Sequence, residues 1–191
     1  MANVIYESPR GYDLVKIEDE FLKDREIFLT EEVNAATMDD LIKQVMFLEK
    51  QDNTKEITLY INSPGGSVSS GLALYDLLMH IKSPVRTVCI GIAASMGAIL
   101  FLAGKKREMM EHGRIMIHDP SYGHLDISGK KPHEIQQELD SLNKTREATA
   151  KIIAKRCNKE IEKIYEVTAN DSYFDADEAL EFGLATDIIR D

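Results

Sequence analysis

The 191-residue sequence has only two cysteines and no tryptophan. Two cysteines cannot build a disulfide framework; Cys89 falls in an apolar run and Cys157 at the polar end of a predicted helix. This usage favours a reducing, intracellular setting. The first residues, MANVIYESPRGYDL, are acidic and polar where a signal peptide would need an apolar stretch. We therefore expect a cytoplasmic protein.

Positive charge is scarce as well. The chain has 23 Lys and Arg against 33 Asp and Glu, which gives a formal net charge of −10. Because binding to nucleic acid needs clustered basic side chains, this balance excludes nucleic acid as the main partner. The one dense basic cluster, at 105–107, is predicted to be a solvated turn.

Long apolar runs are also missing. The longest uncharged stretch, 88–104, only just reaches the roughly 17–25 residues that a membrane span needs. It contains glycines, a serine and a strand-like first third, which fit a buried α/β segment better. We expect no membrane association.

The remaining composition, 43% hydrophobic and 29% charged, is typical of a globular protein, and the length predicts one domain over residues 1–191. Strand-like runs alternate with amphipathic helical patterns, which indicates βαβ units and an α/β fold with a mainly parallel sheet. Residues 1–20, where Pro9 and Gly11 interrupt any periodicity, are predicted to be an N-terminal arm that orders only on a neighbour. The predicted strands are 25–29, 57–61, 85–90, 114–118 and 184–189, and the predicted helices are 37–50 with Thr37 as N-cap, 68–83 with Ser67 as N-cap, 98–103, 132–156, 159–167 and 176–182 with Asp175 as N-cap.

One hydroxyl lies within the longest uncharged stretch. Ser95 follows a buried strand and a tight glycine turn, and a helical pattern begins just after it. Strand, sharp turn, serine and helix are the sequence of elements in a nucleophile elbow, where small neighbours let the backbone bend and expose Oγ. A serine among alanines is equally compatible with a helix cap or a packing position.

Polar or glycine-rich motifs follow three predicted strands, at 62–67, 91–97 and 118–120. Ligands in open α/β sheets gather beyond the carboxyl ends of the strands, so these motifs are expected to meet. Their chemistry fits acyl transfer, since a serine needs a base, a histidine needs an orienting group, and an oxyanion needs backbone N–H donors. The glycine turn around Gly66 would supply such donors.

His118 is the candidate base because it alone among the histidines ends an apolar strand. Asp119 is rejected as its orienting group, since successive side chains of a strand point to opposite faces. Asp171, just before the last helix, is the better candidate. The other histidines are expected to be surface groups: His80, His112, His124 and His133.

Several stretches together resemble the proteolytic subunit of the ATP-dependent Clp protease, the ClpP family. They are FLKDREIFL (21–29), LYINSPGGSV (59–68), YDLLMHIKSPV (75–85), IGIAASMGAILFLAG (90–104), RIMIHDP (114–120) and ADEALEFGL (176–184). The resemblance implies a serine endopeptidase of the ClpP/crotonase fold. It also implies seven-membered rings that stack in pairs around the active sites, and a Clp-type ATPase unfoldase that threads polypeptide substrates in.

Matched position by position, the family pattern makes Ser95 the nucleophile, His118 the general base and Asp171 the third triad member. The oxyanion donors would be the backbone N–H groups of Gly66 and Met96. No metal or bound cofactor is implied, because ATP is used by the partner. The handle-like segment 121–158 would project its long helix, 132–156, towards the opposite ring.

Three departures from the family pattern concern interfaces. Ala169 and Asn170 stand where the family usually has an Asp-Arg pair that bridges the two rings, and His80 replaces an aromatic of the unfoldase-docking pocket. Residues 119–126 replace a glycine-rich strand. These changes predict weaker ring stacking and a divergent second paralogue that works in a mixed assembly.

Two other functions remain open at this point. A crotonase-like acyl-CoA enzyme would share the fold and the oxyanion hole but would use no serine nucleophile. A catalytically weak or silent structural subunit would carry the same residues with the triad out of register.

Overall fold

The computed structural model describes residues 3–9, 11–123 and 126–190. Strands and helices alternate along most of the chain around a mainly parallel sheet, so the predicted α/β fold is confirmed. In the main sheet the order is β3-β4-β5-β6-β9, while β7 pairs with the second half of β5 and β8 pairs antiparallel with β7. The strands of this sheet are β3 (Glu26–Leu29), β4 (Ile57–Ser63), β5 (Val85–Ala94), β6 (Lys106–Met110), β7 (Arg114–Ile117), β8 (Ser172–Phe174) and β9 (Asp187–Ile189).

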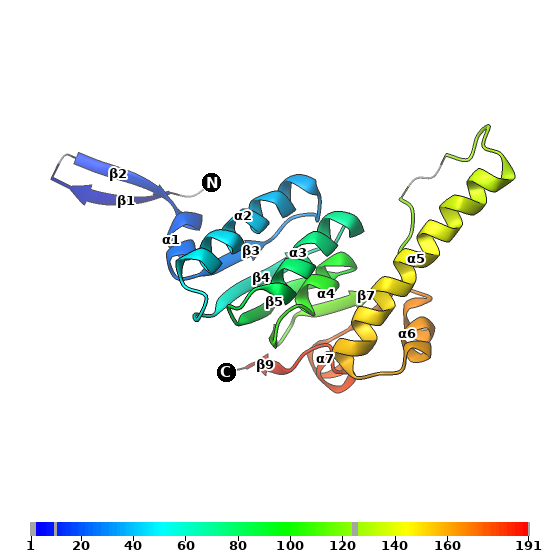
Figure 1. The fold of residues 1–191 in the computed structure, drawn as a ribbon. Coiled ribbons are helices and arrows are strands. Elements are labelled where there is room, and N and C mark those ends of the chain that lie inside the picture. The colour runs from blue at the N-terminus through cyan, green and yellow to red at the C-terminus, as the bar shows by residue number, and fades with distance from the viewer. Residues whose placement is uncertain (1–2, 10, 124–125, 191) are drawn as a thin grey trace.

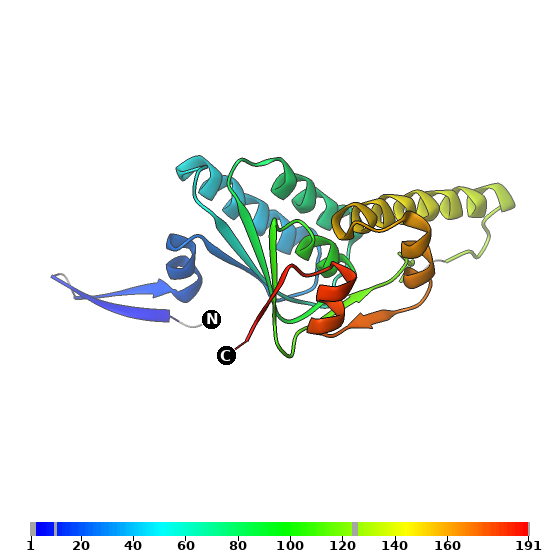
Figure 2. The same cartoon turned by 90° about the horizontal axis from the view of Figure 1, so that it is seen from below.

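Helices α2, α3 and α4 lie together over one face of this sheet (Figures 1 and 2). β4 and β5 are buried along most of their length, as expected for central parallel strands, which read as nearly continuous apolar runs. The helices are α1 (Ile17–Lys23), α2 (Ala35–Gln51), α3 (Val68–His80), α4 (Met96–Phe101), α5 (Pro132–Cys157), α6 (Ile161–Thr168) and α7 (Ala176–Phe182).

The predicted start of α2 is wrong by a few residues. Its N-cap is Asn34, whose side chain accepts hydrogen bonds from the N–H groups of Ala36 and Thr37 at 2.9 and 3.0 Å. Thr37 is the third helical residue and closes the capping box by accepting from the Asn34 N–H. Asn and Thr are both capping residues, so the sequence could not show which of them stands outside the helix.

The predicted N-terminal arm at 1–20 contains regular structure that the sequence did not indicate. β1 (Asn3–Ser8) and β2 (Gly11–Lys16) form an antiparallel hairpin that leads into α1 and stands away from the main sheet (Figure 1). Pro9 and Gly11 flank the bend of this hairpin, where both residue types are favourable, so they turn the chain rather than disrupt it. Whether the arm orders only on a neighbour remains a prediction.

The basic cluster at 105–107 is only partly the predicted solvated turn. Lys105 and Lys106 are exposed, but Lys106 and Arg107 belong to β6, and Arg107 is only 8% exposed. The guanidinium donates to the carbonyls of Leu184 and Gly183, at 2.7 and 3.1 Å, just after the last turn of α7. Carbonyl groups at a helix C-terminus attract a cation, which is why a charged residue is tolerated inside this sheet.

The long predicted helix is confirmed as α5, which extends beyond the rest of the fold with the segment before it (Figure 1). Ala150 and Ile153, in its last third, are buried in the main core. Over the described ranges, no helix combines the length and the apolar character needed to cross a membrane.

Candidate active site

Ser95 lies at the sharp turn between β5 and α4. Its backbone angles are φ 53° and ψ −118°, which few residues other than glycine adopt. The turn is held from both sides: the Ser95 N–H donates to the Met116 carbonyl at 2.8 Å, and Gly65 approaches closely from the loop after β4. A Cβ at Gly65 would lie 2.8 Å from the Ser95 Cβ, so only glycine fits there. The segment therefore has the geometry of a nucleophile elbow.

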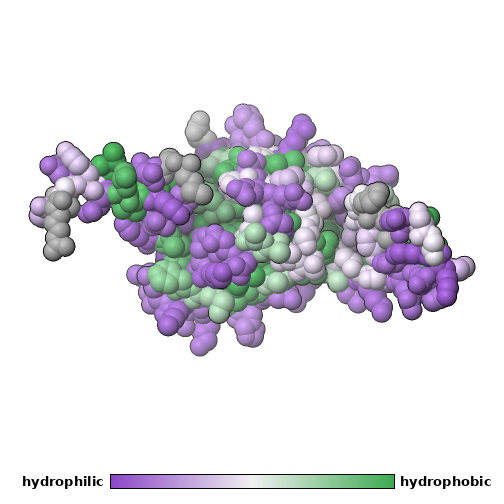
Figure 3. Space-filling view, turned by 90° about the horizontal axis from the view of Figure 1, so that it is seen from above, coloured by the Kyte–Doolittle hydropathy of each residue, from purple (hydrophilic) through white to green (hydrophobic). Residues whose placement is uncertain are grey.

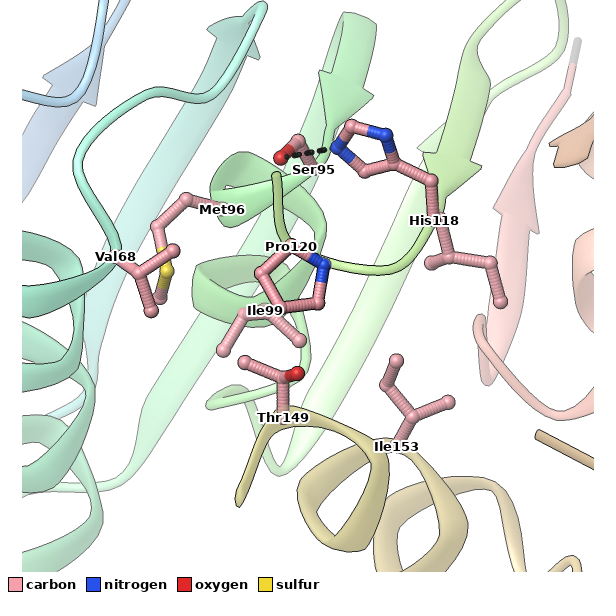
Figure 4. Close-up of a pocket in the computed structure, with 9 residues that line it drawn as sticks. Val68, Ser95, Met96, Ile99, His118, Pro120, Thr149 and Ile153 are labelled. Atoms are coloured by element: carbon pink, nitrogen blue, oxygen red, sulfur yellow. Dashed lines mark hydrogen bonds between the residues drawn. The ribbon is translucent and has the colours of Figure 1, made fainter. Parts of the chain in front are cut away.

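The structure brings Ser95, His118 and Asp171 into one chain of hydrogen bonds, called here the candidate triad. His118 Nε2 lies 2.8 Å from Ser95 Oγ, the contact drawn in Figure 4, and His118 Nδ1 lies 3.0 Å from an Asp171 carboxylate oxygen. The imidazole is 24% exposed and the carboxylate 59% exposed. This order of groups lets Ser95 give its proton to the imidazole while Asp171 holds the other ring nitrogen.

Strand register explains why residues so far apart in the sequence meet. β5 and β7 are parallel with Ala94 opposite Met116, so Ser95 reaches the level at which β7 ends and His118 begins. β7 and β8 are antiparallel with Ile117 opposite Ser172, and one further step along both strands places His118 across from Asp171. Two strand pairs therefore position the three side chains.

The other polar candidates at this edge lie elsewhere. Asp119 turns away from Ser95, and its carboxylate accepts from Arg146 and Thr168 instead. His80, His112 and His133 are exposed as expected, whereas His124 lies outside the described residues.

The predicted oxyanion donors are the amide of Met96, which follows Ser95 in the chain, and that of Gly66, which follows Gly65, the residue packed against Ser95. In the ladder beside Val33, the Gly65 carbonyl accepts from the Val33 N–H and the Ser67 N–H donates to the Val33 carbonyl, so the Gly66 N–H takes no part in it. Met96 is the first residue of α4, whose first N–H groups have no partner within the helix. Both amides are therefore candidates to bind an oxyanion next to Ser95.

A small pocket, lined mostly by apolar side chains and partly open to solvent, adjoins Ser95 and His118. Figure 4 shows Val68 and Met96 on one side of it and two α5 side chains, Thr149 and Ile153, as its lower wall. Its apolar lining would suit an apolar side chain of a ligand held beside the serine. Sequence reasoning did not single out Thr149 as a site residue, because its distance along the chain gives no signal that α5 returns to this edge.

The cysteines are unsuited to nucleophilic work. Burial raises the pKa of both the Cys89 and the Cys157 thiol to about 11, so both stay protonated near neutral pH. Within the described part of the chain, no group of three or more His, Cys, Asp or Glu could hold a metal ion.

A strand-to-helix serine in contact with a histidine and an aspartate, on an α/β sheet, is the constellation that serine hydrolases use. The family model described as Clp protease matches residues 9–191. The chain therefore belongs to the Clp protease family, and the family implies a peptidase.

Proposed function

We propose that this chain is a serine endopeptidase that cleaves unfolded polypeptides to short peptides, with Ser95, His118 and Asp171 as its catalytic triad. The single observation that carries the proposal is the unbroken hydrogen-bond chain through these three side chains. Membership of the Clp protease family supports peptide bonds as the substrate class.

In the proposed mechanism, Ser95 Oγ attacks the carbonyl carbon of the scissile peptide bond while His118 Nε2 takes the hydroxyl proton. Asp171 keeps the imidazole in the tautomer that can accept this proton. The Gly66 and Met96 N–H groups donate to the oxyanion that forms. The imidazolium then protonates the leaving amine as the C–N bond breaks, and an ester to Ser95 remains.

Water completes the cycle. His118 Nε2 takes a proton from a water molecule, which attacks the ester carbonyl, and the imidazolium returns that proton to Ser95 Oγ as the peptide acid leaves. Every group in this scheme belongs to the chain, to the substrate or to water, so the proposal needs no cofactor or metal in the site.

The pocket beside Ser95 suggests which residue precedes the cleaved bond. Apolar walls favour an apolar side chain, since burying one contributes about 1.5–3 kcal/mol. We therefore propose that the enzyme prefers an apolar residue on the acyl side of the cleaved bond.

We further propose that the protein works as part of a ring assembly in the cytoplasm, fed by a Clp-type ATPase that uses ATP to unfold substrates. Large apolar side chains are exposed on the N-terminal hairpin, on α2 and near the tip of α5. Figure 3 shows apolar surface on the hairpin and across the middle of the body. Apolar surface of this kind is typical of contact sites with other chains.

The alternatives from the sequence fit the geometry less well. A crotonase-like acyl-CoA enzyme would give no role to the 2.8 Å contact between Ser95 and His118. The same contact favours an active peptidase over a silent subunit whose triad is out of register. A mixed assembly with a second paralogue remains compatible with either activity level.

A fluorophosphonate probe tests the proposal, because it phosphonylates only a serine activated by a base. We expect stoichiometric labelling of Ser95 in the assembled protein and hydrolysis of short fluorogenic peptides. Ser95→Ala should abolish labelling and reduce kcat by on the order of 10³-fold or more. Ser121→Ala, an exposed serine in the loop after β7, is the matched control and should change neither. Labelling that persists in Ser95→Ala, or wild-type protein that neither reacts nor cleaves, would refute the proposal.

A further inference from the structure

Asp119 follows His118 directly, yet it belongs to a different set of contacts. Its carboxylate accepts from Arg146 Nε of α5 and from Thr168 Oγ1 at the end of α6, both at 2.6 Å. Its backbone N–H donates to the Thr168 carbonyl at 2.7 Å. Asp119 therefore binds to two helices at once, whereas the neighbouring His118 belongs to the candidate triad.

The two side chains that bind Asp119, Arg146 and Thr168, are themselves restricted by their surroundings. Thr168 is 2% exposed, and the Arg146 guanidinium lies over the Tyr165 ring, 4.3 Å from its centre. Such a cation–π contact restricts a long side chain that would otherwise move freely. Asp119 therefore binds to two side chains that have little freedom to move.

These contacts of Asp119 lie next to the two chain segments that must meet in the triad. His118 is one residue before Asp119, and Asp171 is three residues after Thr168. The two hydrogen bonds between Asp119 and Thr168 consequently fix how far apart these segments lie. Asp171 is 59% exposed, so burial of its own side chain does little to hold it beside His118.

We propose that Asp119 is a positioning residue, which through Arg146 and Thr168 holds His118 at hydrogen-bonding distance from Ser95 and Asp171. The inference rests on the proposed peptidase function. Asp119 touches no reacting atom; it limits the movement of the backbone that carries the base. A displacement of about 1 Å in such a group can cost on the order of 10²-fold in rate.

Loss of the Arg146 contact should release the 118–119 segment rather than α5. Ala150 and Ile153, one and two turns further along α5, are each 2% exposed and packed in the core. The pocket wall made by this helix should therefore stay in place. This predicts a fall in kcat with little change in KM.

The test compares Asp119→Asn, Arg146→Gln and the double variant, each assayed as the assembled protein on a short fluorogenic peptide. We expect kcat to fall about tenfold or more in each single variant, with KM nearly constant. The double variant should be no slower than the slower single variant, because both changes break one contact. Glu147→Gln is the matched control and should leave kcat unchanged. It removes an α5 carboxylate whose ion pair, within the described part of the chain, is with Lys151 of the same helix.

Crystal structures of the wild-type protein and Asp119→Asn provide a readout that does not depend on activity. We expect the distance from His118 to Ser95 or to Asp171 to lengthen beyond hydrogen bonding in the variant. Three outcomes would overturn the inference. They are distances that stay the same in Asp119→Asn, single variants whose kcat equals that of an active wild type, and losses of kcat that add up in the double variant. An inactive wild type with lengthened distances in the variant would instead refute the proposed function and leave the positioning role standing.

Discussion

The backbone conformation of Ser95 is itself unfavourable for the stability of the fold. A residue other than glycine at φ 53° carries strain of about 1–3 kcal/mol, which persists only where neighbouring contacts enforce it. The Met116 carbonyl and the close approach of Gly65 provide that enforcement. The strain has a use in the proposed mechanism, because the same bend turns Oγ towards His118 Nε2.

The two buried thiols predict how stability depends on pH in the alkaline range. Burial raises the pKa of Cys89 and Cys157 from 9.0 to about 11, so the folded chain keeps these protons when the unfolded chain releases them. Their contribution to stability is therefore complete below about pH 9 and is lost as the pH rises towards 11. At pH 10 the loss should be about 1 kcal/mol per thiol.

Urea unfolding at a series of pH values measures this effect. The double variant Cys89→Ala/Cys157→Ala is the comparison, since tyrosines and lysines titrate in the same range and remain in both proteins. We expect a steeper loss of stability between about pH 9 and 11 in the wild type than in the variant. Parallel curves would show that the thiols ionise equally in both states.

Among the elements, α3 and α4 meet at Gly71 and Met96. A Cβ at Gly71 would lie 2.3 Å from the Met96 Cγ, close to the base of that side chain, so Met96 would have to leave its present rotamer. Met96 also lines the pocket, and its N–H is a proposed oxyanion donor. This one packing contact therefore connects helix packing to the site.

Gly71→Ala should lower both stability and activity. Overpacking costs about 1–3 kcal/mol, against which the better helix propensity of alanine restores at most about 1 kcal/mol. We expect a lower denaturation midpoint and slower labelling of Ser95 by the fluorophosphonate probe. Gly123→Ala is the control, because a Cβ at that position would meet no other atom within 4 Å, and it should be close to neutral. Full activity and stability in Gly71→Ala would mean that Met96 repacks without moving the turn.

At the scale of the whole molecule, the chain exposes large apolar side chains in two places, which is unfavourable for an isolated chain in water. Ile5, Tyr12 and Leu14 on the hairpin are 63%, 75% and 69% exposed, and a two-stranded hairpin is marginally stable alone. Ile135 and Leu139 of α5 form a second exposed pair, one helical turn apart, on the part that projects from the body. Both features fit a chain whose surface is completed by other copies.

The α5 pair predicts how the proposed assembly comes apart. Leu139→Lys places a charge within the apolar pair and should shift native mass spectra from double rings to single rings or smaller species. Gln136→Lys adds the same charge to the same helix but at a polar position, and should change the distribution little. The missing charged pair at Ala169 and Asn170 predicts that even the wild type dissociates readily as salt rises and concentration falls. Equal spectra for Leu139→Lys and wild type would place the ring contact elsewhere.

The sequence by itself determined most of the fold, because each prediction depended on local patterns. Apolar runs predicted β4 and β5, apolar residues at helical spacing predicted α5, and the pair Asp175 and Glu178 predicted the capping box of α7. Ser95 and His118 were found in the same way, from a serine after a tight turn and a histidine at a strand end. Asp171 was the better candidate once Asp119 was rejected, and the family pattern then made it the third triad member.

Only the tertiary structure decided which of these groups meet. The three-residue strand β8 is too short to leave a pattern, yet its pairing with β7 carries Asp171 to His118. The burial of Arg107 was missed for a similar reason, since it depends on carbonyl groups far along the chain. The hairpin of β1 and β2 is a local pairing and was missed for another reason: Pro9 and Gly11 were interpreted as breaks in periodicity, whereas they flank its bend. Local propensity acts over a few residues, whereas strand register and hydrogen bonding to distant carbonyls are set when the whole chain packs.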